Sequence, residues 1–347
     1  VYRVMIPLVC IFAVLIVPSY LASNANDFYY GSSKIYGDTT QYGQDAAAIE
    51  EMYGKSDTYV AMVPRGDLAA EQELSGALND ILQVKSILSY VDTVGAQIPV
   101  EYLDEDIVSQ LVSENYSRFV ITVEADYEGE ETFDLVENIR NIVNTYYPDS
   151  YYLAGTGVST YDLMDTITAD TIKVNLIAIG AVFLVLLLTM KSLSLPVILV
   201  LAIETAVWIN VSVPYFSGSV IFYISYLIIS SIQLGATVDY AILFTERYLE
   251  FRSQMGKKSA VIETVAVVTP SVLTSGTVLA VVGFLLGYIS SHGILSQLGI
   301  FIGRGSLLSL FIVLFVLPGL LYLLDGLVRR TTLHLHFYNP SKEGITK

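Results

Sequence analysis

The chain has 347 residues, of which 53% are hydrophobic and 15% charged, and its formal net charge at pH 7 is −16. It is too apolar for a soluble protein with a single core, and its long apolar runs indicate a membrane protein. Basic residues are scattered at the ends of these runs, which excludes a nucleic-acid-binding face, and the single cysteine, Cys10, excludes an intrachain disulfide.

The acidic residues are concentrated in one part of the chain. Of the 34 acidic residues, 27 lie between Ser23 and Asp170, where only 6 of the 18 basic residues are found. This division predicts an acidic, water-exposed domain inserted into a mildly basic membrane body. We expect residues 1–23 to form a first transmembrane helix, 24–170 the inserted domain, 171–328 the remaining transmembrane helices and 329–347 a tail.

The first apolar run, Val4 to Leu21, has two interpretations. The small residues that follow it, Ala22 to Ala25, would suit the cleavage site of a signal peptide. The run is nearly long enough to span a bilayer, and we therefore favour a transmembrane helix. Because the first residue is Val1 and not methionine, we expect the sequence to be a fragment of a longer protein.

The inserted domain shows the order strand, helix, strand twice. That order is the split βαβ pattern of an α+β ferredoxin-like sandwich. It holds no histidine or cysteine, so we expect no catalytic site, metal or cofactor there. The predicted strands are Thr58–Val63, Ser86–Val94, Phe119–Val123 and Tyr151–Ala154, and the predicted helices are Gln44–Tyr53, Leu68–Leu82 and Glu131–Tyr146.

One acidic cluster in this domain has the carboxylates that a cation site would need. Its carboxylates are consecutive or nearly so, and side chains at such spacing do not face each other on a helix. We interpret it as a solvated loop. The cluster consists of Glu101, Asp104, Glu105 and Asp106.

Five further apolar segments follow the domain, and a helix beginning near Val158 is expected to run into the first of them. With the first run they predict an α-helical bundle of six transmembrane helices. The five segments are Ile172–Met190, Leu195–Val213, Ser219–Thr245, Val267–Ile289 and Leu295–Leu324.

The basic residues at the ends of the spans fall on one side of the predicted bundle. The connections Pro214–Gly218 and Ser290–Gly293 contain none. Since short cytoplasmic segments are enriched in Lys and Arg, both termini should be cytoplasmic and the acidic domain outside. We also expect Phe251–Val265 to form an amphipathic helix on the inner surface. The basic residues concerned are Arg3, Lys191, Arg247, Arg252, Lys257, Lys258, Arg329 and Arg330.

An aspartate, Asp239, lies inside the fourth apolar segment. An unpaired Asp at the centre of a transmembrane helix costs roughly 2.5 kcal/mol or more, so it indicates a function. We interpret Asp239 as a proton carrier with Tyr240 beside it, and Gly235 as a site of close helix packing. The alternative is that Asp239 joins helices through a structural hydrogen bond.

Two other ionisable residues, Glu204 and Arg304, are also expected near the midplane at 1.5 Å of rise per residue. We predict that they form a buried ion pair. Asp239 would then lack a cation and favour its neutral form. Thr274, Ser275 and Thr277 are expected at the same depth, where they would either donate hydrogen bonds to Asp239 or bond to their own helix.

Two glycine pairs lie in the last two spans, Gly283 with Gly287 and Gly299 with Gly303. Glycines four residues apart on a transmembrane helix allow a neighbouring backbone to approach closely. The pairs therefore predict close packing between helices and carry no functional information.

The segment Gly235-Ala236-Thr237-Val238-Asp239-Tyr240, continued by Phe244 and Arg247, resembles the fourth helix of each half of resistance-nodulation-division (RND) transporters, in their MmpL-like branch. Ser271–Gly276 and Gly299–Pro318 are similar to the fifth and sixth helices of such a half. The sequence departs from the pattern in having Glu246 before Arg247 and only Glu250 after it.

This resemblance implies a transporter and not an enzyme. It implies export of lipids, amphiphiles or hydrophobic drugs across a bacterial cell membrane, driven by protons that Asp239 and Tyr240 exchange. The chain would supply one half. The tail from His334 to Lys347 is interpreted as a C-terminus, which predicts the C-terminal half, paired with a first half or a second copy.

Three alternatives were weighed. A SecD/SecF-type subunit assisting protein export also carries an acid in its fourth helix, but Tyr240 after Asp239 favours the MmpL-like branch. An intramembrane aspartyl protease needs two carboxylates at one site, whereas Glu204 has Arg304 as a predicted partner. A lipid- or sterol-sensing module that binds without pumping would tolerate Asp239→Asn, whereas a pump would not.

Overall fold

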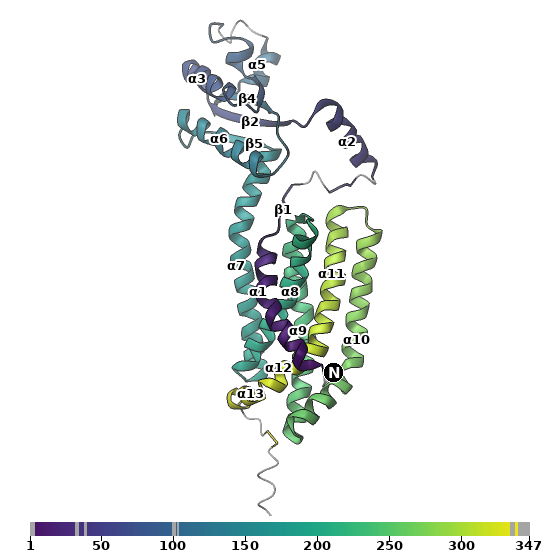
Figure 1. The fold of residues 1–347 in the computed structure, drawn as a ribbon. Helices are drawn as coiled ribbons and strands as arrows, with labels where there is room; N and C mark the ends of the chain where they lie inside the picture. Colours follow the sequence, from purple (N-terminus) through teal and green to yellow (C-terminus); the bar gives the residue numbers. More distant parts are fainter. Residues whose placement is uncertain are drawn as a thin grey trace, which may run out of the picture. The chain divides into compact units, whose positions relative to one another are not determined.

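The computed structural model describes residues 4–31, 35–37, 40–98, 102, 104–333 and 337–338. The chain divides into two compact units (Figure 1): residues 1–29 with 170–347 form a helical unit, and residues 30–169 form an α/β unit. Some residues named above fall outside the description, namely Arg3, Glu101 and, in the tail, residues 334–336 and 339–347.

Six helical segments of the described chain are long and apolar enough to cross a membrane, as the sequence predicts. The sixth is composite, because a π-helical segment interrupts it. The segments are α1 (Met5–Asn24), α7 (Thr156–Met190), α8 (Ser194–Ser217), α9 (Tyr223–Gln254), α10 (Lys257–Ile289), and α11 (Gly293–Phe311) continued by η2 (Ile312–Val316) and α12 (Leu317–Leu323).

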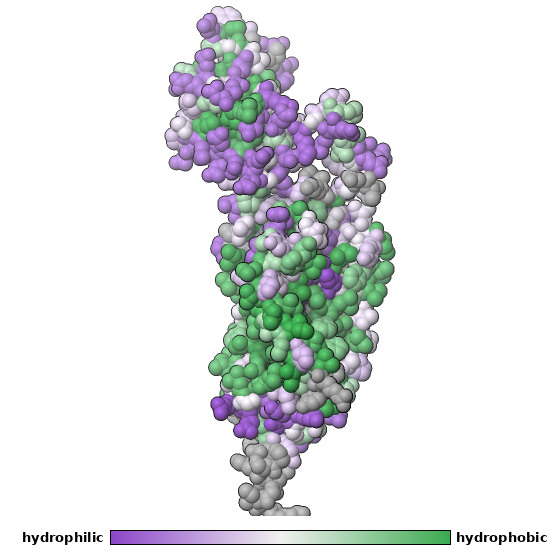
Figure 2. All heavy atoms as spheres, in the orientation of Figure 1, coloured by the Kyte–Doolittle hydropathy of each residue, from purple (hydrophilic) through white to green (hydrophobic). Residues whose placement is uncertain are grey.

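The surface of this helical unit is largely apolar, as the green belt in Figure 2 shows. Such a surface suits contact with lipid. Short elements complete the unit: β1 (Phe28–Tyr29) pairs in parallel with β6 (Ile221–Phe222), and α13 (Asp325–Thr331) follows the last span.

The predicted surface helix Phe251–Val265 is wrong. Residues up to Gln254 belong to α9, and α10 begins at Lys257, so only Met255 and Gly256 separate two long helices. Gly256 has an extended backbone and ends the turn. From Lys257 onward no helix-breaking residue occurs until Pro270, and the helix therefore continues into the apolar span.

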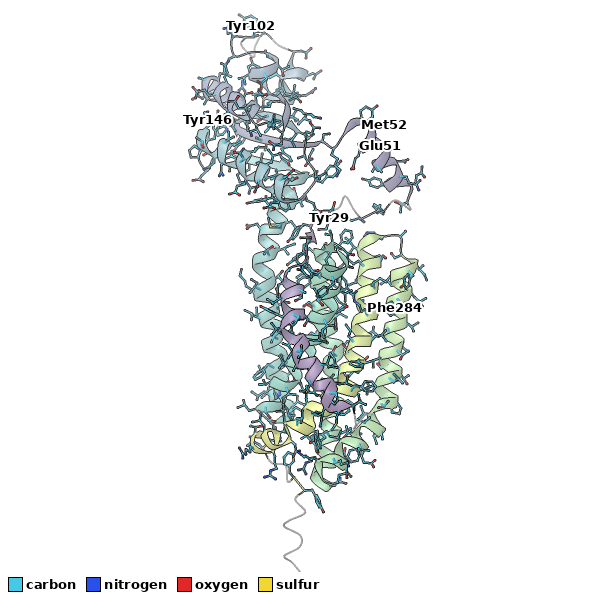
Figure 3. All side chains as sticks on the ribbon, viewed as in Figure 1. Tyr29, Glu51, Met52, Tyr102, Tyr146 and Phe284 are labelled. Atoms are coloured by element: carbon cyan, nitrogen blue, oxygen red, sulfur yellow. The ribbon has the colours of Figure 1, made fainter. Side chains whose placement is uncertain are left out.

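The close packing predicted from the glycine pairs is confirmed between α10 and α11. A Cβ at Gly283 would lie 2.8 Å from the Cα of Gly303, and one at Gly299 would lie 2.8 Å from the Cα of Gly287. A Cβ at Gly303 would also lie 2.8 Å from the ring of Phe284, which is labelled in Figure 3. Any side chain at these positions would push the two helices apart.

The end of the helical unit that carries α13 is joined by a buried ion pair. Arg252 of α9 donates from Nε and Nη2 to the carboxylate of Asp325 at 2.8 and 3.2 Å. Tyr248 donates to the same carboxylate at 2.8 Å. Arg252 also donates from Nη1 to the backbone oxygen of Tyr338 at 2.9 Å. This network ties α9 to α13 and to residues 337–338.

The α/β unit contains a four-stranded antiparallel sheet in the order β3-β4-β2-β5. Helix α3 connects β2 to β3, and α6 connects β4 to β5. The alternation of buried and exposed residues in β2 and β4 places one face of the sheet in a core. The strands are β2 (Asp57–Pro64), β3 (Val84–Leu88), β4 (Tyr116–Val123) and β5 (Tyr152–Gly155), and the helices are α2 (Gln41–Tyr53), α3 (Leu68–Asn79), α4 (Tyr90–Thr93), α5 (Glu105–Leu111) and α6 (Glu130–Tyr146).

One predicted strand is wrong in its second half. Residues 86–88 belong to β3, but Tyr90–Thr93 form the short helix α4. The reason is a helix cap, because the Ser89 side chain accepts a hydrogen bond from the backbone N–H of Asp92. In the acidic cluster, Asp104 likewise caps α5 by accepting from the N–H of Asp106.

Candidate functional site

Asp239 lies in the middle of α9 on an exposed stripe of that helix. The exposed residues along α9 recur every three or four positions, which defines one face of a helix. No hydrogen bond or ion pair to the Asp239 carboxylate is formed by any residue that the structure describes. The stripe consists of Ile224, Ile228, Ser231, Ile232, Gly235, Asp239, Glu246 and Glu250.

Tyr240 is half-buried and its phenol oxygen lies 3.2 Å from Oγ of Ser275 on α10. Of the two other hydroxyls expected near Asp239, that of Thr274 donates to the backbone oxygen of Pro270 at 2.7 Å. In this structure none of the three hydroxyls, of Thr274, Ser275 and Thr277, donates to Asp239. Ser275 belongs to the site through Tyr240, and Thr274 bonds to its own helix.

Gly235 does not pack closely against any part of the chain that the structure describes. A Cβ built on it would meet no atom within 4 Å, unlike the Cβ atoms built on the glycines of α10 and α11. Within this chain the expected close packing at Gly235 is therefore wrong. The space beside Gly235 and Asp239 is open.

The predicted ion pair between Glu204 and Arg304 is wrong. Arg304 of α11 donates instead to Asn210 of α8, from Nε to Oδ1 at 2.6 Å and from Nη2 to the backbone oxygen at 2.8 Å. Depth along a helix predicts the level of a residue but not its direction. Glu204 and Asn210 are six residues apart, about 240° around the helix at 100° per residue, so only one of them can face α11.

Asn210 continues this network to α9. Its Nδ2 donates to Oε1 of Gln233 at 2.8 Å and to the backbone oxygen of Phe301 at 3.0 Å. Because Arg304 can only donate, Asn210 must accept with its oxygen, and its amide orientation then fixes that of Gln233. Sequence reasoning missed Asn210 and Gln233 because it considered only ionisable residues; a neutral amide inside an apolar span is the signal that would have found them.

A small internal cavity of about 10 Å³ lies between α9, α10 and α11, with both Gln233 and Tyr240 in its lining. This volume is about that of one water probe. Other lining groups are Thr237 and Ser309, whose hydroxyl oxygens are 2.6 Å apart. Hydroxyl and amide groups therefore run from Tyr240 into the interior of the bundle.

Glu204 lies on the side of α8 away from Arg304, in a cavity of about 220 Å³ between α1, α7, α8 and α9. Among the described residues, none forms a hydrogen bond or ion pair with its carboxylate. No three His, Cys, Asp or Glu side chains in the described parts of the chain come together as a metal site requires. The helical unit thus holds two intramembrane carboxylates without a partner, Asp239 on its surface and Glu204 in a cavity.

Two comparisons with known proteins bear on this arrangement. The profile described as "MMPL family" matches residues 39–334, which is most of the chain. A bacterial protein described as "Probable transport protein MmpL9", from Mycobacterium tuberculosis (strain ATCC 25618 / H37Rv), is 26% identical over 207 residues. That alignment covers 56% of this chain and 21% of the relative, so the chain spans only a minor part of the relative's length.

Proposed function

The chain belongs to the MMPL family of membrane transporters, and from this membership we propose that it forms half of an exporter driven by the proton gradient. The proposed cargo is a lipid, an amphiphile or a hydrophobic drug. Asp239 and Tyr240 are the groups proposed to exchange protons, with Ser275 as the hydrogen-bond partner of Tyr240.

The observation that carries this proposal is the unpartnered carboxylate of Asp239 in the middle of an apolar helix. An ionised Asp at the centre of a bilayer costs about 2.5–3.5 kcal/mol even by the lower scales. The side chain is therefore stable there only when it is neutral or covered by protein. An acid that is neutral in one arrangement and ionised in another carries a proton between them.

The exposed stripe on α9 supports a partner for this chain. Lipid would leave the Asp239 carboxylate without a hydrogen bond, whereas a second helix could approach closely because Gly235 has no side chain. We propose that the stripe packs against the corresponding helix of a second half or of a second copy. Asp239 and Tyr240 would then lie at the centre of the complete transporter.

We propose that residues 30–169 form a ferredoxin-like porter domain outside the membrane. The strand order β3-β4-β2-β5, with a helical crossover after β2 and after β4, supports this assignment. The basic residues of α13, Arg329 and Arg330, support a cytoplasmic C-terminus. The bacterial source of the relative supports a location in a bacterial cell membrane.

The proposed cycle uses the two states of Asp239. Protonation from the outer side removes the charge at the centre of α9 and favours one packing of the halves. Release of the proton to the cytoplasm restores the charge and favours a packing in which water or a partner group reaches the carboxylate. The difference between the two packings would move cargo through the domain outside.

The test is proton-driven efflux of a fluorescent amphiphile from vesicles that hold the full-length protein. Asp239→Asn keeps the size of the side chain but removes its ionisation, and we expect it to abolish gradient-driven efflux. Glu263→Gln is the matched control, because Glu263 is an exposed acid near the start of α10 and is not part of the stripe, so it should retain efflux.

Efflux by Asp239→Asn that still depends on the gradient would contradict the proposed role of Asp239 and leave the residue as a structural contact. If the wild type moves no amphiphile, the same vesicles can be tested for lipid binding and for stimulation of protein export. Those outcomes would favour a lipid-sensing module or a SecD/SecF-type subunit.

A further inference from the structure

The cavity beside Glu204 is lined by four helices of the helical unit, and among the described residues that line it only Glu204 is charged. On α8 the lining residues are Glu204, Val207, Trp208 and Val211, whose spacing of three and four residues places them on one face. Facing them are Tyr20 of α1, Asn175 of α7 and Tyr226 of α9. The cavity thus combines one carboxylate with several aromatic rings.

The carboxylate of Glu204 calls for a counter-charge that the described part of the chain does not provide. The nearest candidate by depth, Arg304, gives its donors to Asn210 on another side of α8. A carboxylate inside a membrane is expensive unless a proton or a cation neutralises it. Around Glu204 the helices leave a cavity of about 220 Å³, and this volume can admit a cation from outside.

The aromatic rings around the carboxylate define the kind of cation. Trp208 lies one helical turn from Glu204, and its ring packs edge-on against that of Tyr20, with centroids 5.0 Å apart. Aromatic faces bind organic ammonium groups through cation–π interactions, most strongly at Trp. A Ca²⁺ ion, by contrast, takes six to eight oxygen ligands, whereas much of this lining is apolar, including Leu176, Val207 and Val211.

The volume and the outer wall of the cavity define the rest of the ligand. Pockets for whole drug-sized molecules measure about 300–1,000 Å³, so about 220 Å³ suits a head group alone. On the α7 side the wall is loosely packed, since Leu176 lines the cavity and is still 65% exposed. A hydrocarbon tail could extend past α7 into the surrounding lipid.

We propose that this cavity is a binding site for the ammonium head group of a single-chain cationic amphiphile, with Glu204 as the counter-charge and Trp208 and Tyr226 as the aromatic faces. As a statement about cargo this rests on the proposed export function. As a statement about binding it does not, because a ligand can occupy the site whether or not protons drive its movement.

Trp208 makes the site directly observable, because it is the single tryptophan of the 347 residues. The experiment titrates the chain in lipid nanodiscs with dodecyltrimethylammonium and follows Trp208 fluorescence. Dodecyl maltoside and dodecyl sulfate have the same tail with a neutral or anionic head group and serve as matched probes. We expect a saturable change with the ammonium probe at a concentration at least tenfold lower than with either of the others.

Glu204→Gln should weaken binding of the ammonium probe by roughly tenfold or more, which corresponds to about 1.4 kcal/mol. The matched control Glu263→Gln, at an exposed acid of α10 that does not line the cavity, should leave it unchanged. Should Glu204→Gln fail to insert, Tyr226→Leu compared with Tyr226→Phe tests the aromatic contribution, and only the leucine variant should bind more weakly.

Equal responses to the three head groups, or equal affinity of wild type and Glu204→Gln, would overturn the proposal and make the cavity a crevice filled by lipid tails. No saturable response to any probe would also overturn it. Because no proton gradient is applied, these outcomes are independent of whether Asp239→Asn abolishes efflux.

Discussion

At the end of the bundle that carries α13, the charged side chains of α9 and α13 bind each other, whereas halfway along the helices two carboxylates have no partner among the described residues. Arg252 and Asp325 are 5% and 6% exposed and share three hydrogen bonds with each other and Tyr248. Asp239 and Glu204 accept none from the described residues. A paired buried charge holds helices together, whereas an unpaired intramembrane charge carries a free-energy cost and marks a candidate functional site.

Breaking the ion pair between Arg252 and Asp325 should lower the free energy of unfolding more than the other substitutions below. Asp325→Asn leaves the buried guanidinium of Arg252 without a carboxylate, and breaking a buried pair in this way costs about 3–5 kcal/mol. We expect the free energy of unfolding of the detergent-solubilised protein to fall by this amount. The matched control is Glu250→Gln, which breaks the exposed pair with Arg247 and should cost at most about 1 kcal/mol. Equal losses for the two variants would contradict the distinction.

Asn210→Leu tests the intermediate case, in which a charge is held by neutral amides. The substitution removes the acceptor of Arg304 Nε and the donor to Gln233, and each buried group left unsatisfied costs about 1–3 kcal/mol. We expect a lower unfolding midpoint in a denaturant titration. Ser212→Ala on the same helix removes a hydroxyl that bonds only to its own backbone and should change the midpoint little.

Glu71 of α3, in the α/β unit, is a third case to compare, because its carboxylate is buried and has a hydrogen-bond partner but no ion pair among the described residues. Its buried carboxylate accepts a hydrogen bond from Ser117 at 2.7 Å, but burial, the larger effect, raises the pKa of Glu71 above its ordinary value of 4.5. The folded state therefore binds the proton more tightly than the unfolded state. The contribution of Glu71 to the stability of the α/β unit should be highest below pH 4.5 and fall as the pH rises from there through the raised pKa.

Hydrogen exchange of the β4 amides, corrected for intrinsic exchange rates, would measure this dependence in the whole chain. Glu71→Gln should remove the fall in protection between acidic and neutral pH. If the variant keeps the same pH dependence as the wild type, another group is responsible.

Glu204→Gln should have the smallest effect on stability, although it makes the same chemical change as Asp325→Asn. No described group loses a partner, so we expect the free energy of unfolding to fall by no more than about 0.5 kcal/mol, or to rise. The same denaturant titration measures both variants. A loss of several kcal/mol would show that Glu204 has a structural partner and would remove the contrast on which this comparison depends.

The sequence predicted the positions of the six spans because each is a long apolar run, and it predicted the contact between α10 and α11 because glycines four residues apart have one consequence in a membrane. The prediction failed for a contact that depends on which way a residue points around its helix. Glu204 and Arg304 are at suitable depths, but Asn210 and not Glu204 lies on the face of α8 that contacts Arg304. It also failed at Phe251–Val265, where two spans were joined by a shorter connection than their hydropathy indicated.

That short connection limits how far the end of α9 and the start of α10 can move apart. Met255 and Gly256 are the only residues between them, and two residues, even fully extended, reach about 7 Å. A displacement of the end of α9 must therefore move the start of α10 as well. Because no side chain fits between the paired glycines of α10 and α11, we expect α9, α10 and α11 to move together.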